Sequence, residues 1–180
     1  MNLSYNESRF KFGGVFSLIT IFVISVLIGL DQYTKYLATA LLDLPGQSYP
    51  FWPDVFHFTY VENRGMAFGM MQGYIPIFAI VSIILFLGII WAFYKLRPMP
   101  LMMRISLSLV AAGGVGNFID RMRLGYVVDF LEVRLFNFWV FNLADTCLTV
   151  GVIIFCIYYF FFHEKYFPPK TKPDTEDVEA

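Results

Sequence analysis

The sequence has few charged residues: Asp, Glu, Lys and Arg make up 15% of its 180 residues, whereas they make up about 25% of a soluble domain. Hydrophobic residues make up 58% and aromatic residues 19%. This composition is typical of an integral membrane protein and excludes an ordinary soluble domain. The formal net charge of −1 gives no basis for binding a polyanion, so we expect no nucleic-acid partner.

Cysteine and histidine are also scarce, with two residues of each. Cys147 and Cys156 fall in one apolar segment, where helical geometry separates them by about 13 Å, too far for a disulfide. We expect both to be buried as small apolar side chains. His57 and His163 are expected on opposite sides of the membrane, which excludes a His-based catalytic triad and a zinc site of the HExxH type. A Ser/Lys pair that uses Lys35 remains open, although no serine is adjacent to it in the sequence.

Long stretches without charge predict the membrane topology. A helix needs about 20 mostly apolar residues to cross a bilayer, and we place four spans near 13–30, 75–94, 101–119 and 142–162. The side that holds both termini and the 95–104 loop has eight Lys and Arg residues, against five on the other side. This bias favours cytoplasmic termini.

The segments outside the spans complete the expected fold. The first apolar run is longer than the ~7–15-residue core of a signal peptide, so we expect it to be retained as a span. The stretch "DVFHFTYVEN" is rich in β-prone residues and predicts a small external β element on the membrane surface. We therefore expect an all-α membrane protein with four transmembrane helices, a small external β element and a surface loop. It would form a single integral membrane domain over 1–163, followed by a disordered cytoplasmic tail over 164–180.

Two of the spans carry polar residues at the end that we expect to be external. Asp145 lies within an apolar segment, although an aspartate at the centre of a membrane helix costs about 2.5–3.5 kcal/mol, and Asn142 lies one turn before it. Asn117 and Asp120 share one stripe of the third span. A structural interpretation is that these residues, with Arg121, join helices through hydrogen bonds and ion pairs.

Asp129 lies among apolar neighbours, which include Val128 and Phe130. Burial of a carboxyl group raises its pKa, and a second carboxylate nearby raises it further, so that the two can share one proton. An aspartic peptidase uses this state, because the ionised member draws a proton from water while the protonated member polarises the scissile carbonyl. Asp129 and Asp145, both expected at the external ends of spans, are the candidate catalytic pair.

Two further polar stretches are expected near the same surface. Asp31 and Lys35 have the i, i+4 order of a helical ion pair, which favours a structural role for Lys35. Asp31 and Gln32 are expected to face the same water layer as the candidate pair. Asn63 and Arg64 could bind a polar substrate backbone or a lipid headgroup.

Two other functions are consistent with carboxylates in a membrane protein. A proton- or ion-coupled transporter uses paired intramembrane carboxylates. It also needs polar residues along a path through the bilayer, whereas the second span offers only Ser82 in its interior. In a noncatalytic scaffold, the polar clusters would only hold helices together. Charge-neutral Asp→Asn replacements distinguish these functions.

Five short motifs, taken in order, resemble one known family. "DQYTK", "ENRGMAFG", "GGVGNFIDR", "VVDF" and "FNLADT" are similar to motifs of the lipoprotein signal peptidase (signal peptidase II) family, over roughly residues 20–160. The resemblance implies a bacterial inner-membrane aspartic endopeptidase that removes signal peptides from diacylglyceryl-modified prolipoproteins. The implied cleavage is just before the lipid-modified cysteine, and the implied catalytic pair is Asp129 and Asp145.

The resemblance also assigns supporting roles. The residues expected to bind substrate or support the site are Asp31, Gln32, Lys35, Asn63, Arg64, Gly65, Asn117, Asp120, Arg121 and Asn142. Met66 stands where the family usually has alanine. The implied partners are prolipoproteins and membrane lipids. We expect a monomer that needs no metal and no organic cofactor, with its active site at the external face of the membrane.

Overall fold

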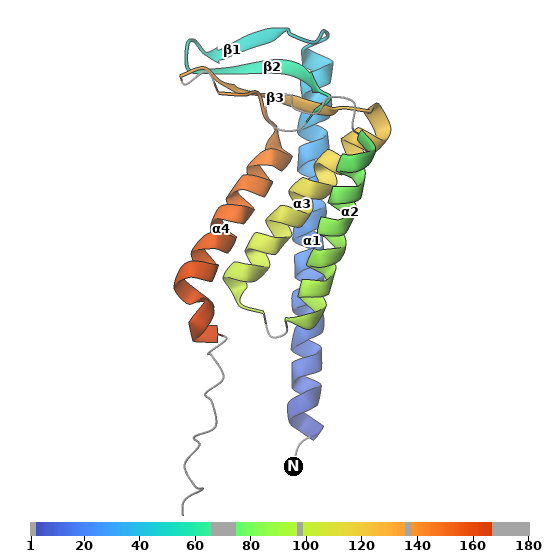
Figure 1. The fold of residues 1–180 in the computed structure, drawn as a ribbon, viewed down its shortest axis with the longest axis vertical. Coiled ribbons are helices and arrows are strands. Elements are labelled where there is room, and N and C mark those ends of the chain that lie inside the picture. The colour runs from blue at the N-terminus through green and yellow to red at the C-terminus, as the bar shows by residue number, and fades with distance from the viewer. Residues whose placement is uncertain (1–2, 66–74, 97–98, 136–137, 167–180) are drawn as a thin grey trace, which may run out of the picture.

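The structure is a computed structural model that describes residues 3–65, 75–96, 99–135 and 138–166. In this part of the chain, helices run side by side and a small sheet lies at one end of the bundle (Figure 1). The helices are α1 (Leu3–Leu41), α2 (Ile75–Lys95), α3 (Leu101–Leu124) and α4 (Leu143–Tyr166), and the strands are β1 (Ser48–Trp52), β2 (Phe56–Asn63) and β3 (Val127–Val133).

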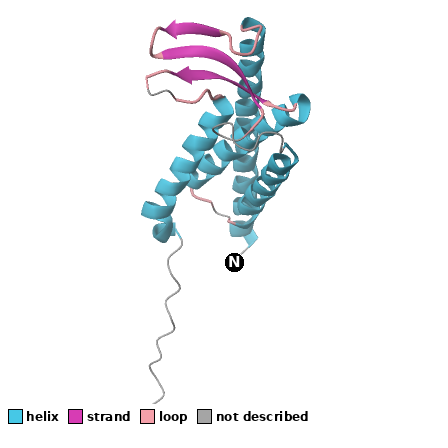
Figure 2. Cartoon of the chain, turned by 45° about the horizontal axis from the view of Figure 1, so that its top comes forward, coloured by secondary structure: helices cyan, strands magenta, loops and turns pink. Residues whose placement is uncertain are grey.

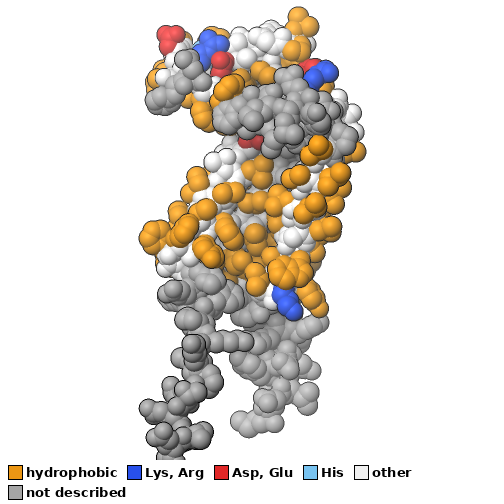
Figure 3. Space-filling view, viewed as in Figure 1, with side chains coloured by type: hydrophobic (Ala, Val, Ile, Leu, Met, Phe, Trp, Pro, Cys, Tyr) orange, Lys and Arg blue, Asp and Glu red, His pale blue; other side chains and the backbone are white. Residues whose placement is uncertain are grey.

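Within the described residues, three helices are long and apolar enough to cross a membrane. These segments are Leu18–Leu41, Leu101–Leu124 and Leu143–Phe162, while α2 contributes a shorter apolar run, Ile80–Lys95. Hydrophobic side chains cover the visible face of the helices, and the charged side chains in this view lie toward the two ends (Figure 3). The chain is therefore a mostly helical membrane protein with a small sheet, and the crossing by α2 stays a prediction.

Helix α1 extends beyond residue 30, where we predicted the first span to end. α1 continues to Leu41, so Asp31 and Lys35 lie inside the helix, where they are only 2% and 3% exposed. The expectation that Asp31 faces a water layer is wrong, because its side chain is buried, whereas Gln32 is half-buried. The helix accommodates Asp31 and Lys35 because the Lys35 Nζ atom lies 2.9 Å from a carboxylate oxygen of Asp31 and 2.9 Å from one of Asp120. Such pairing is the usual condition for charge inside a membrane helix bundle.

The β element is larger than the single predicted stretch. β2 coincides with that stretch, and β1 and β3 pair with it on either side in the antiparallel order β1-β2-β3 (Figure 2). β3 places Asp129 opposite Val61 of β2. The expectation that Asp129 ends a membrane span is therefore wrong, because the residue lies in a strand of the sheet.

The boundary between α3 and β3 has a local cause. Gly125 follows α3 with a φ of 77°, a left-handed conformation that glycine adopts without strain, and its N–H donates to the Arg121 carbonyl. The next residues, 127–133, are mainly β-branched or large and apolar, which favours an extended strand. The chain therefore turns back toward β2 instead of prolonging α3.

α3 packs against each of the other three helices. Glycines let the backbones approach closely. A Cβ atom added at Gly116 would lie 2.6 Å from the Asp31 Oδ2 atom and 3.2 Å from the Ala144 Cβ atom. A larger residue at this position would therefore separate α1, α3 and the start of α4.

Three smaller expectations have mixed outcomes. Both cysteines are free, but only Cys147 is buried, and the expected burial of Cys156 is wrong because that residue is exposed on α4. α4 continues to Tyr166, so residues 164–166 are helical and not part of a disordered tail. The rest of that tail, 167–180, and Met66 lie outside the described residues.

Candidate active site

Asp145 lies in the first turn of α4, which begins at Leu143, immediately after Asn142. The backbone N–H of Asp145 donates to the Asn142 Oδ1 atom at 2.9 Å, and the backbone N–H of Asn142 donates to the Asp145 Oδ2 atom at 3.3 Å. This reciprocal arrangement is a capping box, which satisfies N–H groups that have no partner within the helix. The local sequence therefore fixes the Asp145 carboxylate at the end of the helix.

Asp129 is 2% exposed in β3. The Asn63 Nδ2 group donates to its Oδ2 atom at 2.9 Å, and the Asn142 Nδ2 group donates to its Oδ1 atom at 2.7 Å. Burial, and then the negative charge of Asp145, raise the pKa of Asp129 to about 7, although the two amide donors oppose this rise. Asp129 can therefore gain or lose a proton near neutral pH.

The amide of Asn142 connects the two aspartates. Its Oδ1 atom accepts the Asp145 backbone N–H, and its Nδ2 group donates to Asp129. Asn117 of α3 completes the link, because its Nδ2 group donates to the Asp145 Oδ1 atom at 2.7 Å and its Oδ1 atom lies 3.1 Å from Asn142 Nδ2. The structure thus brings four of the predicted site residues into one hydrogen-bonded group.

Lys35 is the centre of an adjacent buried charge cluster. Its Nζ group donates to the Asn117 Oδ1 atom at 2.9 Å and pairs with Asp31 and Asp120, each at 2.9 Å. All of these side chains are buried. The predicted ion pair between Asp31 and Lys35 is confirmed, and Asp120 extends it to α3.

The carboxylates of this cluster also hold backbone next to the candidate catalytic residues. The Asp31 Oδ1 atom accepts the N–H of Ala144 in α4 at 2.9 Å, and the Asp120 Oδ2 atom accepts the N–H of Val128 in β3 at 3.1 Å. Each of these backbone groups directly precedes a candidate catalytic aspartate. Lys35 therefore joins α1 and α3 to both segments that carry the aspartates.

Gln32, Arg121 and Gly65 extend the same network. The Gln32 Nε2 group donates to the Asp120 Oδ1 atom at 2.9 Å. An Arg121 guanidinium nitrogen donates to the Gly65 carbonyl at 3.2 Å, and the Gly65 N–H donates to the Asn63 Oδ1 atom at 3.0 Å. The last contact orients the Asn63 amide, so that its Nδ2 group faces the carboxylate in β3.

Arg64 is placed differently from the other predicted site residues. Its exposed guanidinium pairs with Glu62 at 2.9 Å and lies 5.6 Å from the ring centroid of Tyr126. Arg64 thus contacts Glu62 and Tyr126, two residues that sequence reasoning did not single out. The spacing of Glu62 and Arg64 could have predicted their ion pair, because residues two apart in an extended chain point to the same side.

The backbone donors of Ala144 and Val128 were also missed. No residue type could have revealed them, since every residue except proline carries a backbone N–H. The strand β3 was missed as well, although the run of β-branched and apolar residues over 127–133 was a usable signal.

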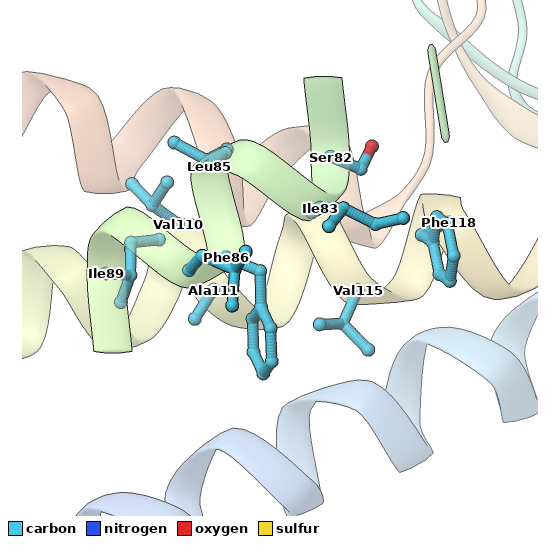
Figure 4. A pocket seen from close by; sticks show the side chains of 11 residues that line it. Ser82, Ile83, Leu85, Phe86, Ile89, Val110, Ala111, Val115 and Phe118 are labelled. Atoms are coloured by element: carbon cyan, nitrogen blue, oxygen red, sulfur yellow. The ribbon is translucent and has the colours of Figure 1, made fainter. Parts of the chain in front are cut away.

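An apolar pocket lies between α2 and α3, apart from this network (Figure 4). Leu85 and Phe86 of α2 and Val115 and Phe118 of α3 are among its lining residues. Ser82, the polar residue singled out in the second predicted span, also lines it. The predicted site residues take no part in this lining.

The arrangement suits proton transfer. The two carboxyl groups are linked through the amides of Asn117 and Asn142, and burial and the charge of Asp145 raise the pKa of one of them, Asp129, to about 7. One carboxylate can take a proton from water while the other carboxyl group donates one to a carbonyl oxygen. Among the described residues, no group of three or more His, Cys, Asp or Glu side chains is arranged to hold a metal ion.

Comparison with known sequences gives a consistent result. Residues 23–161 match the model of a family described as signal peptidase (SPase) II. A lipoprotein signal peptidase of Caldanaerobacter subterraneus subsp. tengcongensis is 43% identical over 134 residues, which cover 74% of this chain and 90% of the relative. One from Clostridioides difficile is 41% identical over 151 residues, which cover 82% of this chain and 99% of the relative.

Comparison with solved structures agrees. A structure described as a bacterial membrane enzyme superposes with a TM-score of 0.75 at 32% sequence identity, covering 86% of this chain and 93% of the other. A second bacterial membrane enzyme superposes with a TM-score of 0.72 at 35% identity, covering 80% of this chain and 94% of the other.

Proposed function

Because the chain belongs to the signal peptidase II family, we propose that it is an aspartic endopeptidase that uses Asp129 and Asp145 as its catalytic pair. Its substrates are prolipoproteins that carry a diacylglyceryl group on a cysteine, and it removes the signal peptide just before that cysteine. The active protein is a monomer in the bacterial inner membrane.

The position of Asn142 between the two aspartates is the observation that carries this proposal. Its amide donates to Asp129 at 2.7 Å and accepts from the backbone of Asp145 at 2.9 Å. An amide in this position holds the two carboxyl groups in a fixed relation, as general acid–base catalysis requires. Proton transfer by the two aspartates needs neither a metal nor an organic cofactor.

The location of the pair suits a substrate anchored in lipid. Asp129 belongs to the sheet and Asp145 to the first turn of a candidate span, so the pair lies where the apolar helices meet the sheet. Water can reach this level without crossing hydrocarbon, while the acyl chains of the substrate remain in the bilayer. We further propose that α2 forms a fourth span, that both termini are cytoplasmic and that the site faces the external side.

Cleavage of a synthetic, lipid-modified prolipoprotein by purified protein tests the catalytic proposal. Asp129→Asn and Asp145→Asn are each expected to abolish cleavage while leaving the protein folded, because asparagine keeps the shape of the side chain but cannot transfer the proton. Asp54→Asn is the matched control: Asp54 is exposed at a turn with a φ of 62°, which asparagine tolerates, and activity should be retained. Substantial cleavage by either dyad variant would remove that residue from the catalytic role.

The orientation has a separate test. Single cysteines introduced between α2 and α3, at positions 96–100, of a variant that lacks Cys147 and Cys156 should react with a membrane-impermeant thiol reagent only after the cytoplasmic side is opened. Labelling in intact cells from the external side would reverse the proposed orientation.

A further inference from the structure

We propose that the two aspartates have different and fixed roles: Asp145 is the ionised member that takes a proton from water, and Asp129 is the protonated member that donates to the scissile carbonyl. This inference rests on the proposed function. It concerns an asymmetry between the two carboxyl groups that follows from what each of them contacts.

The first asymmetry is the helix end. Asp145 lies in the first turn of α4, and its Oδ2 atom accepts the backbone N–H of Asn142, the residue just before the helix, at 3.3 Å. The N-terminus of a helix carries a partial positive charge that favours an anionic side chain. Asp129 lies in a strand, and strands have no comparable net dipole.

The second asymmetry is the electrostatic effect of a cation, which an amide passes on to Asp145. Lys35 Nζ donates to the Asn117 Oδ1 atom at 2.9 Å, and Asn117 Nδ2 donates to the Asp145 Oδ1 atom at 2.7 Å. A cation on the oxygen side of an amide polarises its N–H groups, so the donor that reaches Asp145 is strengthened. This chain stabilises negative charge on Asp145.

In the part of the chain that the structure describes, the amide oxygens of the two donors to Asp129 accept backbone N–H groups, which are neutral. Asn63 accepts the backbone N–H of Gly65 at 3.0 Å, and Asn142 accepts the backbone N–H of Asp145 at 2.9 Å. Lys35 and Arg121 are charged groups that act on both aspartates, so their direct fields do not by themselves separate the pair. The raised pKa of Asp129, caused by burial and the charge of Asp145, agrees with a proton on Asp129.

These roles give a balanced reaction. The Asp145 carboxylate takes a proton from water, the water oxygen bonds to the scissile carbonyl carbon, and Asp129 gives its proton to the carbonyl oxygen. Asp145 then donates its proton to the leaving nitrogen as the carbon–nitrogen bond breaks. Asp129 regains a proton from a hydroxyl of the tetrahedral intermediate as the new carboxylic acid forms, which restores the initial state of both residues.

Carbon-13 NMR of the protein in detergent micelles, labelled at aspartate carboxyl carbons, tests the assignment. Asp129→Asn and Asp145→Asn serve to identify the two signals, and the titration itself uses the wild type, because each replacement removes the mutual repulsion of the pair. Coupled groups titrate in shared steps, but the chemical shift of each carbon reports where the proton lies. The Asp129 signal is expected to carry most of the step near pH 7. If the Asp145 signal carries that step, or the two share it equally, the assignment is wrong.

Two matched variants test the reason for the asymmetry. Asn117→Ala and Asn63→Ala each delete one amide donor, the first to Asp145 and the second to Asp129. Asn117→Ala is expected to move part of the step near pH 7 to the Asp145 signal. Asn63→Ala should leave the step on Asp129 and raise its midpoint by about one pH unit. An unchanged distribution in Asn117→Ala would overturn the role of the Lys35–Asn117 chain.

The NMR result is independent of the cleavage result. If Asp129→Asn cleaves substrate, the proposed catalytic pair fails whatever the titration shows. If neither dyad variant cleaves but the proton lies on Asp145, the pair stands and only the assignment of roles fails. A variant that does not fold is recognised by circular dichroism, and one folded dyad variant is enough, because the signal that it lacks identifies that aspartate in the wild-type titration.

Discussion

Replacement of Lys35 by methionine is expected to destabilise the folded protein strongly. The Lys35 ammonium group neutralises two buried carboxylates, those of Asp31 and Asp120, each 2.9 Å from Nζ. Methionine fills a similar volume but leaves both carboxylates buried without this counter-ion. Removing one partner of a buried ion pair costs about 3–5 kcal/mol, and we expect a loss of that size in the free energy of unfolding.

Unfolding in detergent micelles, followed by circular dichroism, measures this loss. The matched control is Arg134→Met, which removes a cation 3.1 Å from Glu132 where the arginine side chain is 43% exposed. Exposed ion pairs contribute about 0–1 kcal/mol, so the control should remain close to the wild type. A Lys35→Met protein as stable as Arg134→Met would refute the charge argument.

A triple variant separates charge from packing. Lys35→Met combined with Asp31→Asn and Asp120→Asn removes all three charges and keeps the side-chain volumes nearly constant. Neutral buried groups avoid the cost of unpaired charge, so the triple variant is expected to recover most of the lost stability. If it is no more stable than Lys35→Met, lost packing and not unpaired charge explains the effect.

The remaining predictions concern pH and helix packing. The pKa of Asp129 is raised to about 7 by burial and by Asp145, whereas an unfolded aspartate has a pKa of about 3.9. The folded state therefore binds more protons in this window, and stability should fall as pH rises from about 4 to about 7. Asp129→Asn should flatten this dependence, and an identical pH profile would contradict the reasoning. Gly116→Ala places a Cβ atom 2.6 Å from the Asp31 Oδ2 atom and should lower stability by about 1–3 kcal/mol. Gly114→Ala, whose Cβ atom would lie 3.8 Å from a Leu85 side-chain carbon, should not lower stability. Equal losses in the two variants would show that the close approach is unimportant.

The sequence by itself determined the class of protein and most of the residues that meet at the site. Long apolar runs predict membrane helices because every backbone N–H and carbonyl must be paired inside hydrocarbon, and a helix does this within one segment. β2 was predictable because its β-prone residues are contiguous. Asp129 and Asp145 could be singled out because a carboxylate among apolar residues is costly and needs a reason.

Only the tertiary structure decided how these residues are arranged. Asp129 belongs to a strand because β3 pairs with β2, and Asp120 neutralises Lys35 across α3 and α1. Arg64 pairs with Glu62 and lies near the ring of Tyr126. Such pairings join segments far apart in the chain, and their free energy depends on burial and side-chain direction, which residue order alone does not specify. The local pattern thus predicts elements, while the contacts that distinguish one aspartate from the other arise only when α1, α3, β3 and α4 pack together.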